Sequence, residues 1–119
     1  MKKIILGLFL VFSFVLSASA MTMDEAMQQS KPTVVMFKMQ GCSACRAYEP
    51  TFDGISSKYS DKYNFLKEDV YTSSLSSHLN IQSVPTIVII YPGTKKVYKV
   101  PQNVINQKPN GLEQILDKK

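Results

Sequence analysis

Apolar and polar residues follow two different periods along this 119-residue chain. Short apolar runs rich in β-branched and aromatic side chains are typical of strands, and such runs are bounded here by turn residues. Pro92-Gly93 is a strong turn signal between the last two runs. The predicted strands are Thr33–Met39, Tyr63–Lys67, Thr86–Tyr91 and Lys96–Val100.

Between these runs the apolar positions recur with helical spacing. The clearest stripe predicts a helix from Cys42 to about Lys58, with Pro50 inside it; its members are Ala44, Tyr48, Phe52, Ile55 and Tyr59. Shorter helices are expected from the Thr22/Glu25 capping box to about Gln29, and after Thr72–Ser74. Asn110 is expected to cap a last helix, with Leu112, Ile115 and Leu116 inward, after a polar connection over 101–109.

The order of these elements predicts the architecture. Strands separated by helices are expected to pair in parallel through right-handed crossovers, and the last two strands should form an antiparallel hairpin. The sequence therefore predicts an α/β fold, with a mixed central sheet of about four strands and helices on both faces.

Residues 1–20 have the pattern of a cleavable secretory signal peptide. Met1–Lys3 is basic, Ile4–Leu16 is apolar, and small residues follow up to Ala20. The apolar run is shorter than the roughly 20 residues of a membrane-spanning helix, so we expect cleavage rather than an uncleaved anchor. The mature domain would begin at Met21, comprise residues 21–119, and lie in the periplasm or another extracytoplasmic compartment.

The distribution of charge bears on whether the protein binds nucleic acid. The chain has 14 Lys and Arg against 9 Asp and Glu, a net charge of +5. The excess in the C-terminal half comes largely from Lys95, Lys96 and Lys99 around the turn, which is typical of a solvated surface. We expect no nucleic-acid partner.

The two cysteines, Cys42 and Cys45, are the main candidates for chemistry. They lie three positions apart, where the first predicted strand ends and the long helix begins. The unpaired N–H groups and positive dipole of a helix N-terminus favour a thiolate, which is the reactive form of cysteine. We therefore expect Cys42 to be more exposed and more acidic than Cys45.

Two other interpretations of this cysteine pair fit the sequence less well. A structural disulfide would close a very short loop, which gains the least stabilisation. A structural zinc site needs four ligands, whereas the chain has two cysteines and one histidine, His78, which we expect on the surface of a short helix. We predict no metal and no cofactor.

In its motifs the chain resembles the thioredoxin family. The resemblance rests on the strand–C-x-x-C–helix unit over Thr33–Lys58, on Pro50, on Val84-Pro85-Thr86 before an apolar strand, and on the final hairpin and helix. It covers nearly all of residues 22–119. It implies a redox-active disulfide between Cys42 and Cys45, and a cis peptide bond at Val84-Pro85 beside Cys42. It also implies that Gly41, Val84 and Pro85 contact the substrate.

The chain also departs from the family pattern. Ser43-Ala44 replaces Gly-Pro between the cysteines, Gly41 replaces the usual aromatic residue, and Met36 replaces a buried acid. Without that acid, Lys67, Glu68 and Asp69 on the neighbouring strand remain the candidates to assist Cys45.

The function that the resemblance implies is thiol–disulfide exchange with protein thiols or disulfides outside the cytoplasm. A membrane thiol–disulfide carrier is expected as electron partner, and the chain is expected to be a monomer. The sequence leaves open whether it reduces or oxidises its partners. The alternatives are a redox-inactive binding or assembly module of the same fold, and a metal-handling C-x-x-C protein.

Overall fold

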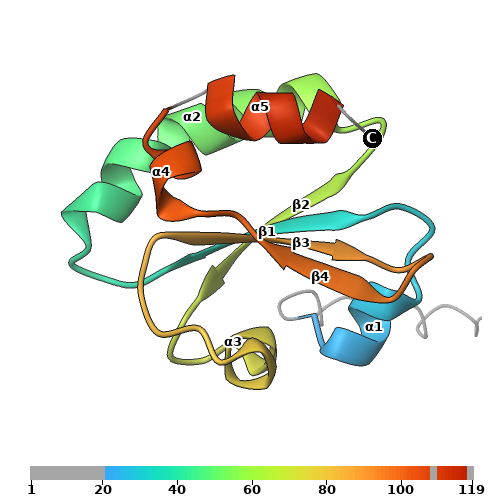
Figure 1. Cartoon of the computed structure of the whole chain (residues 1–119). Coiled ribbons are helices and arrows are strands. Elements are labelled where there is room, and N and C mark those ends of the chain that lie inside the picture. The colour runs from blue at the N-terminus through green and yellow to red at the C-terminus, as the bar shows by residue number, and fades with distance from the viewer. Residues whose placement is uncertain (1–20, 108–109, 118–119) are drawn as a thin grey trace, which may run out of the picture.

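In the computed structural model, residues 21–107 and 110–117 are described, so the predicted signal peptide lies outside the described residues. Helices and strands alternate through most of this part of the chain (Figure 1). The elements are α1 (Met23–Met27), β1 (Thr33–Lys38), α2 (Ser43–Tyr59), β2 (Asn64–Asp69), α3 (Ser74–Leu79), β3 (Thr86–Tyr91), β4 (Lys96–Lys99), α4 (Gln102–Ile105) and α5 (Asn110–Asp117).

The strands form one mixed sheet in the order β2-β1-β3-β4. Strand β1 pairs in parallel with β2, and β3 pairs antiparallel with both β1 and β4. The predicted α/β fold, with four strands flanked by helices, is therefore confirmed. In Figure 1, α2, α4 and α5 lie over one face of the sheet, and α1 and α3 lie under the other.

The expectation that all helix-separated strands run parallel is wrong for β3, and helix length explains why. The 17 residues of α2 span about 26 Å, enough to return along a strand of about 20 Å. The six residues of α3 span only about 9 Å. The chain therefore stays at the end of the sheet where β2 finishes, and β3 starts there, with Thr86 opposite Phe37.

Alternate residues of the central strands pack into two separate clusters, one on each face. Val34 and Met36 point toward the residues of α2, α4 and α5, whereas Val35 and Phe37 point toward α1 and α3. The four residues of β1 from Val34 to Phe37 are fully buried. A strand covered on both faces reads as a continuous apolar run, as predicted for this one.

Several element boundaries differ from the prediction. Strand β2 begins and ends later than expected, and the buried stripe of α2 starts at Cys45, because Ala44 is exposed. The helix stripe is thus Cys45, Tyr48, Phe52, Ile55 and Tyr59.

Helix α4 lies in the segment that was predicted to be a polar connection. It is one turn of four residues, too short to show a helical period, and it is held by the buried side chain of Ile105. A Cβ atom on Gly111 would collide with the Val104 carbonyl, so glycine permits the close packing of α5 on α4. Within the described residues, no helix has the length and apolar character needed to cross a membrane.

Candidate active site

The two cysteines form a disulfide at the junction of β1 and α2. Cys42 is the N-cap residue of α2, and its Cα lies 5.2 Å from that of Cys45. The backbone N–H of Cys45 donates to Cys42 Sγ over 3.0 Å, so the sulfur takes the place that a capping oxygen occupies in other helices. This contact lets the first turn of the helix stabilise negative charge on Cys42.

The two sulfur-bearing residues differ in exposure. Cys45 is 2% exposed and belongs to the cluster beneath α2, whereas Cys42 is only partly buried. The predicted difference in exposure is confirmed. An attacking partner therefore reaches Cys42 before Cys45.

Gly41 precedes the first cysteine in a conformation that favours glycine. Its φ is +81°, and a Cβ atom built there would meet nothing within 4 Å. The backbone can therefore turn sharply from β1 into α2, and the space next to Cys42 stays open.

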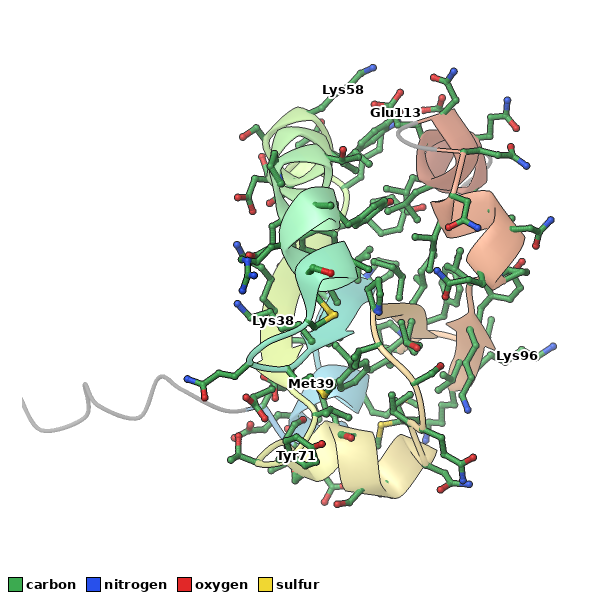
Figure 2. The ribbon with its side chains drawn as sticks, turned by 90° about the vertical axis from the view of Figure 1, so that its left-hand side faces the viewer. Lys38, Met39, Lys58, Tyr71, Lys96 and Glu113 are labelled. Atoms are coloured by element: carbon green, nitrogen blue, oxygen red, sulfur yellow. A yellow bond between two sulfur atoms is a disulfide. The ribbon has the colours of Figure 1, made fainter. Side chains whose placement is uncertain are left out.

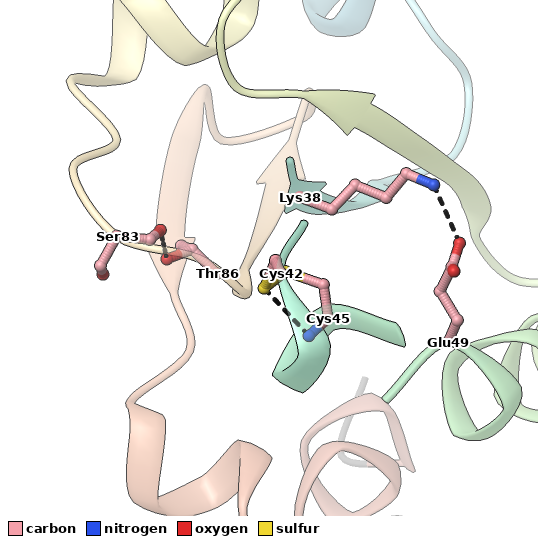
Figure 3. Close-up of a disulfide and its surroundings, with 6 residues drawn as sticks. All are labelled: Lys38, Cys42, Cys45, Glu49, Ser83 and Thr86. Carbon is pink, nitrogen blue, oxygen red and sulfur yellow. Dashed lines mark hydrogen bonds and ion pairs between the residues drawn. A yellow bond between two sulfur atoms is a disulfide. The ribbon is translucent and has the colours of Figure 1, made fainter. Parts of the chain in front are cut away.

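The segment before β3 lies at the same end of the sheet. The Val84–Pro85 peptide bond is cis, as predicted, Pro85 is buried and Val84 is half-buried. Val84 packs against both clusters, and Cys42 packs against the one beneath α2. Figure 3 shows Ser83 and Thr86, on either side of this dipeptide, joined by a hydrogen bond that the Thr86 hydroxyl donates to the Ser83 carbonyl over 2.6 Å.

A group of charged residues lies on the other side of the disulfide (Figure 3). Glu49 Oε2 on α2 lies 3.0 Å from Lys38 Nζ and 3.3 Å from Lys67 Nζ, and Lys67 also lies 3.0 Å from Asp53 Oδ1. Hydrogen bonds lower the pKa of the Glu49 carboxyl, and the bond from Lys38 contributes more than the bond from Lys67. The hydrogen bond to Asp53 raises the pKa of Lys67. We refer to these four residues as the charge network.

The structure separates the three candidates for assisting Cys45. Lys67 is opposite Met36, on the face of the sheet that α2 covers. Glu68 is opposite Phe37, whose side chain belongs to the other face. The Asp69 side chain accepts a hydrogen bond from the N–H of Tyr71 over 2.8 Å. Lys67 and Asp69, which lies opposite Lys38, therefore share the face of Cys45. The ammonium group of Lys67 is paired with Glu49 and Asp53, and the Asp69 carboxylate is bonded to the turn that follows β2.

Sequence reasoning missed Lys38, Glu49 and Asp53. Glu49 and Asp53 lie four and eight residues after Cys45, and this spacing places Cys45, Glu49 and Asp53 near one side of α2. The spacing could have identified Glu49 and Asp53 from the sequence. His78 is exposed on α3, as predicted. Across 21–107 and 110–117, no group of three or more His, Cys, Asp or Glu side chains is placed to hold a metal ion.

Comparison with known proteins gives consistent matches. The family model described as Thioredoxin matches residues 14–118. A thioredoxin of Mycoplasmoides gallisepticum is 27% identical over 89 residues, covering 71% of this chain and 88% of that protein. Thioredoxin 1 of Synechococcus elongatus is 32% identical over 73 residues, covering 60% of this chain and 68% of that protein.

Two further matches extend the comparison. A chloroplastic thioredoxin-like protein of Arabidopsis thaliana is 34% identical over 73 residues, 59% of this chain, but the match spans only 28% of that protein's length. The crystal structure of a Malassezia sympodialis thioredoxin has a TM-score of 0.55 and 27% identity, covering 71% of this chain and 80% of that one. Together with the C-x-x-C pair, these matches support thiol–disulfide oxidoreductase activity.

Proposed function

Because the chain belongs to the thioredoxin family, we propose that it is a thiol–disulfide oxidoreductase acting on extracytoplasmic proteins through Cys42 and Cys45. The single observation that carries this proposal is the disulfide at the start of α2. Its outer sulfur is accessible and accepts a backbone hydrogen bond, whereas its inner sulfur is buried. A purely structural disulfide needs neither arrangement.

The geometry supports exchange in two steps. In the reduced protein, the Cys42 thiolate attacks one sulfur of a partner disulfide; a mixed disulfide forms, and the other partner sulfur leaves as a thiolate and takes up a proton. Cys45, after losing its proton, attacks Cys42 Sγ and releases the second partner thiol. Two electrons pass from the protein dithiol to the partner, and the Cys42–Cys45 disulfide is left. The reverse steps oxidise a partner dithiol.

The segment before β3 supports a role in partner binding. Val84 is half-buried, and its place beside the end of β1 suits a backbone that pairs with an extended segment of the partner. Pro85 has no N–H, so it brings no backbone donor toward the sulfurs. Gly41 leaves the approach to Cys42 open.

The N-terminal sequence pattern supports an extracytoplasmic setting for the reaction. A basic start, an apolar run and small residues up to Ala20 support export. In an oxidising compartment, a reductant must be re-reduced, and a membrane thiol–disulfide carrier is the class of partner that would supply those electrons.

N-terminal sequencing of protein from the extracytoplasmic fraction should give Met21, and light scattering should give a monomer. A start at Met1 in the membrane pellet would contradict export.

The activity is tested by reduction of insulin disulfides with dithiothreitol as electron source. The wild type should accelerate insulin reduction, and Cys42→Ser should abolish this acceleration. The potential of the Cys42–Cys45 pair, measured against glutathione or dithiothreitol, decides between reductant and oxidant. A folded wild type that exchanges with no disulfide would instead favour a binding or assembly module.

A further inference from the structure

A hollow of about 420 Å³ opens at the end of the sheet that carries the disulfide. It lies between the strand ends and the segment after α3; its lining residues are Met39, Val70, Tyr71, Ile81, Gln82, Ser83 and Val84. We propose that this hollow binds a bulky apolar side chain next to the reacting cysteine of the partner protein, and that Tyr71 determines this specificity. The inference rests on the proposed exchange function and names its substrate class.

The chemistry of the lining indicates the occupant. Met39, Val70, Ile81 and Val84 are aliphatic or thioether side chains, and Tyr71 is aromatic. The remaining two, Gln82 and Ser83, are uncharged, so no lining side chain would pair with a charge. An apolar side chain loses little by entering such a site and gains from leaving water.

Gly41 leaves open the space between Met39, which lines the hollow, and Cys42. The residue directly before Cys42 is glycine, whose side chain is a single hydrogen atom. A Cβ built on Gly41 would meet no atom within 4 Å. No side chain at this position therefore stands between the approach to Cys42 and the neighbouring surface.

Tyr71 supplies an aromatic ring from a different element. Tyr71 is 79% exposed. The other large apolar residue that is exposed in the described part of the chain, Tyr98, is 42% exposed. The backbone of Tyr71 is held nevertheless, because its N–H donates to Asp69 Oδ1 over 2.8 Å and the N–H of Ser73 donates to Asp69 O over 3.0 Å. Figure 2 shows Met39 and Tyr71 on the same side of the molecule, with Lys38 beyond them toward α2. An ordered but exposed tyrosine is typical of binding surfaces.

The hollow is continuous with the reaction site. Val84 lines it and also packs, like Cys42, against the cluster beneath α2. Met39 lines it too, and its carbonyl accepts the N–H of Cys42 over 3.3 Å. A partner segment joined to Cys42 by a mixed disulfide therefore passes over the hollow, and a side chain adjacent to the partner cysteine reaches it.

Peptide disulfides test this specificity directly. The probes are homodimeric disulfides of acetyl-Xaa-Cys-Ser-amide and acetyl-Ser-Cys-Xaa-amide, with Xaa as Phe, Ser or Glu. The reduced full-length mature protein is mixed with each probe, and the released peptide thiol is quantified after acid quenching. Rates with hydroxyethyl disulfide, which carries no peptide, normalise each protein for the intrinsic reactivity of its thiol.

The wild type should react with a Phe probe roughly tenfold faster than with the Ser probe, and slowest with the Glu probe. Tyr71→Ser should bring the Phe-to-Ser ratio close to one, whereas Tyr71→Phe should restore it. Tyr98→Ser is the matched control, because Tyr98 is also exposed but lies on β4, outside the lining of the hollow. It should keep the wild-type ratio.

Three results would overturn the inference. These are equal rates with Phe and Ser probes in the wild type, a preserved ratio in Tyr71→Ser, or the same loss of ratio in Tyr98→Ser. If Tyr71→Ser does not give the wild-type circular dichroism spectrum, Met39→Ser replaces it with the same expected loss. Failure to react even with hydroxyethyl disulfide would reject the proposed exchange function itself, whereas reaction without preference rejects only the specificity.

Discussion

Cys42 and Cys45 have unequal environments, although they are only three residues apart. Cys42 caps α2 and is partly exposed, whereas Cys45 is 2% exposed within an apolar cluster. A helix N-terminus lowers a thiol pKa, and burial in apolar surroundings raises it. The nucleophile and the resolving thiol are therefore assigned by position in the helix.

Alkylation of the reduced protein tests this assignment. With iodoacetamide at pH 7, Cys42 should be modified at least about tenfold faster than Cys45, because the thiolate reacts and Cys42 is the accessible one. Mass spectrometry of peptides from a time course gives both rates. Cys45→Ser should leave Cys42 reactive, and faster modification of Cys45 would reverse the roles.

Gly41 and Gly54 form a matched pair for the role of backbone conformation. Both have room for a Cβ atom, but only Gly41 has a positive φ, +81°. Gly41→Ala should lower the free energy of unfolding by about 1–2 kcal/mol, because an L-residue is strained there. Gly54→Ala, in the interior of α2, should raise it by about 0.8–1 kcal/mol. Urea denaturation of the oxidised proteins measures both, and equal effects would show that the turn at Gly41 tolerates a side chain.

At the scale of elements, the charge network joins α2 to the ends of β1 and β2. Glu49 on α2 pairs with Lys38 of β1 and Lys67 of β2, and these bonds lower the pKa of Glu49. A carboxyl with a lowered pKa stabilises the fold above its unfolded pKa, about 4.3, and this stabilisation is lost as the pH falls through the folded pKa.

Glu49→Gln should therefore destabilise the protein at pH 7 by up to about 1 kcal/mol, and the difference should vanish in acid. Urea denaturation of both proteins between pH 7 and pH 3 measures this. In a Lys38→Gln, Lys67→Gln background, the Glu49 substitution should have almost no pH-dependent effect. A difference that stays constant down to pH 3 would mean that Glu49 acts through packing and not through its charge.

Sequence patterns predicted elements well where the chain is long and periodic, and poorly where one short turn decides the structure. The run Thr86–Tyr91 and the helix over Ser43–Tyr59 were found nearly as they are, because burial selects their side chains along many residues. The direction of β3 was missed, although the shortness of α3 already limited it. Helix α4 was missed because four residues show no period.

At the scale of the whole molecule, the site residues that could be predicted from their pattern are those that lie close together in the sequence. Cys42, Cys45 and Gly41 lie within one turn, and the family resemblance added Val84 and Pro85. The hollow could not be predicted, since it brings together Met39, Tyr71 and Ile81 from three connections. Their proximity depends on the sheet order, which only the folded chain defines.

Three buried tyrosines gather between α2, α5 and the start of β2. Tyr59 donates a hydrogen bond to Asp117 Oδ1 over 2.7 Å, and Tyr63 donates to the Leu116 carbonyl over 3.0 Å. The hydrogen bond to Asp117 raises the pKa of Tyr59 to about 12. Burial is the main cause that raises the pKa of Tyr48 and of Tyr63 to about 12. Each phenol thus prefers its neutral form in the folded state.

These tyrosines should make the fold sensitive to base. A phenol ionises near pH 10 in the unfolded chain. Its contribution is therefore complete below pH 10 and is lost as the pH rises through the folded value of about 12. Urea denaturation from pH 8 to pH 12 should show a steep fall in stability above pH 10, with phenolate absorbance at 295 nm rising as the protein unfolds.

Tyr63→Phe should be about 1 kcal/mol less stable at pH 8, because it loses a buried hydrogen bond, but its free energy of unfolding should fall less steeply above pH 10. Full ionisation of the tyrosines near pH 10 with the helical signal intact would show that this interface is not closed to water.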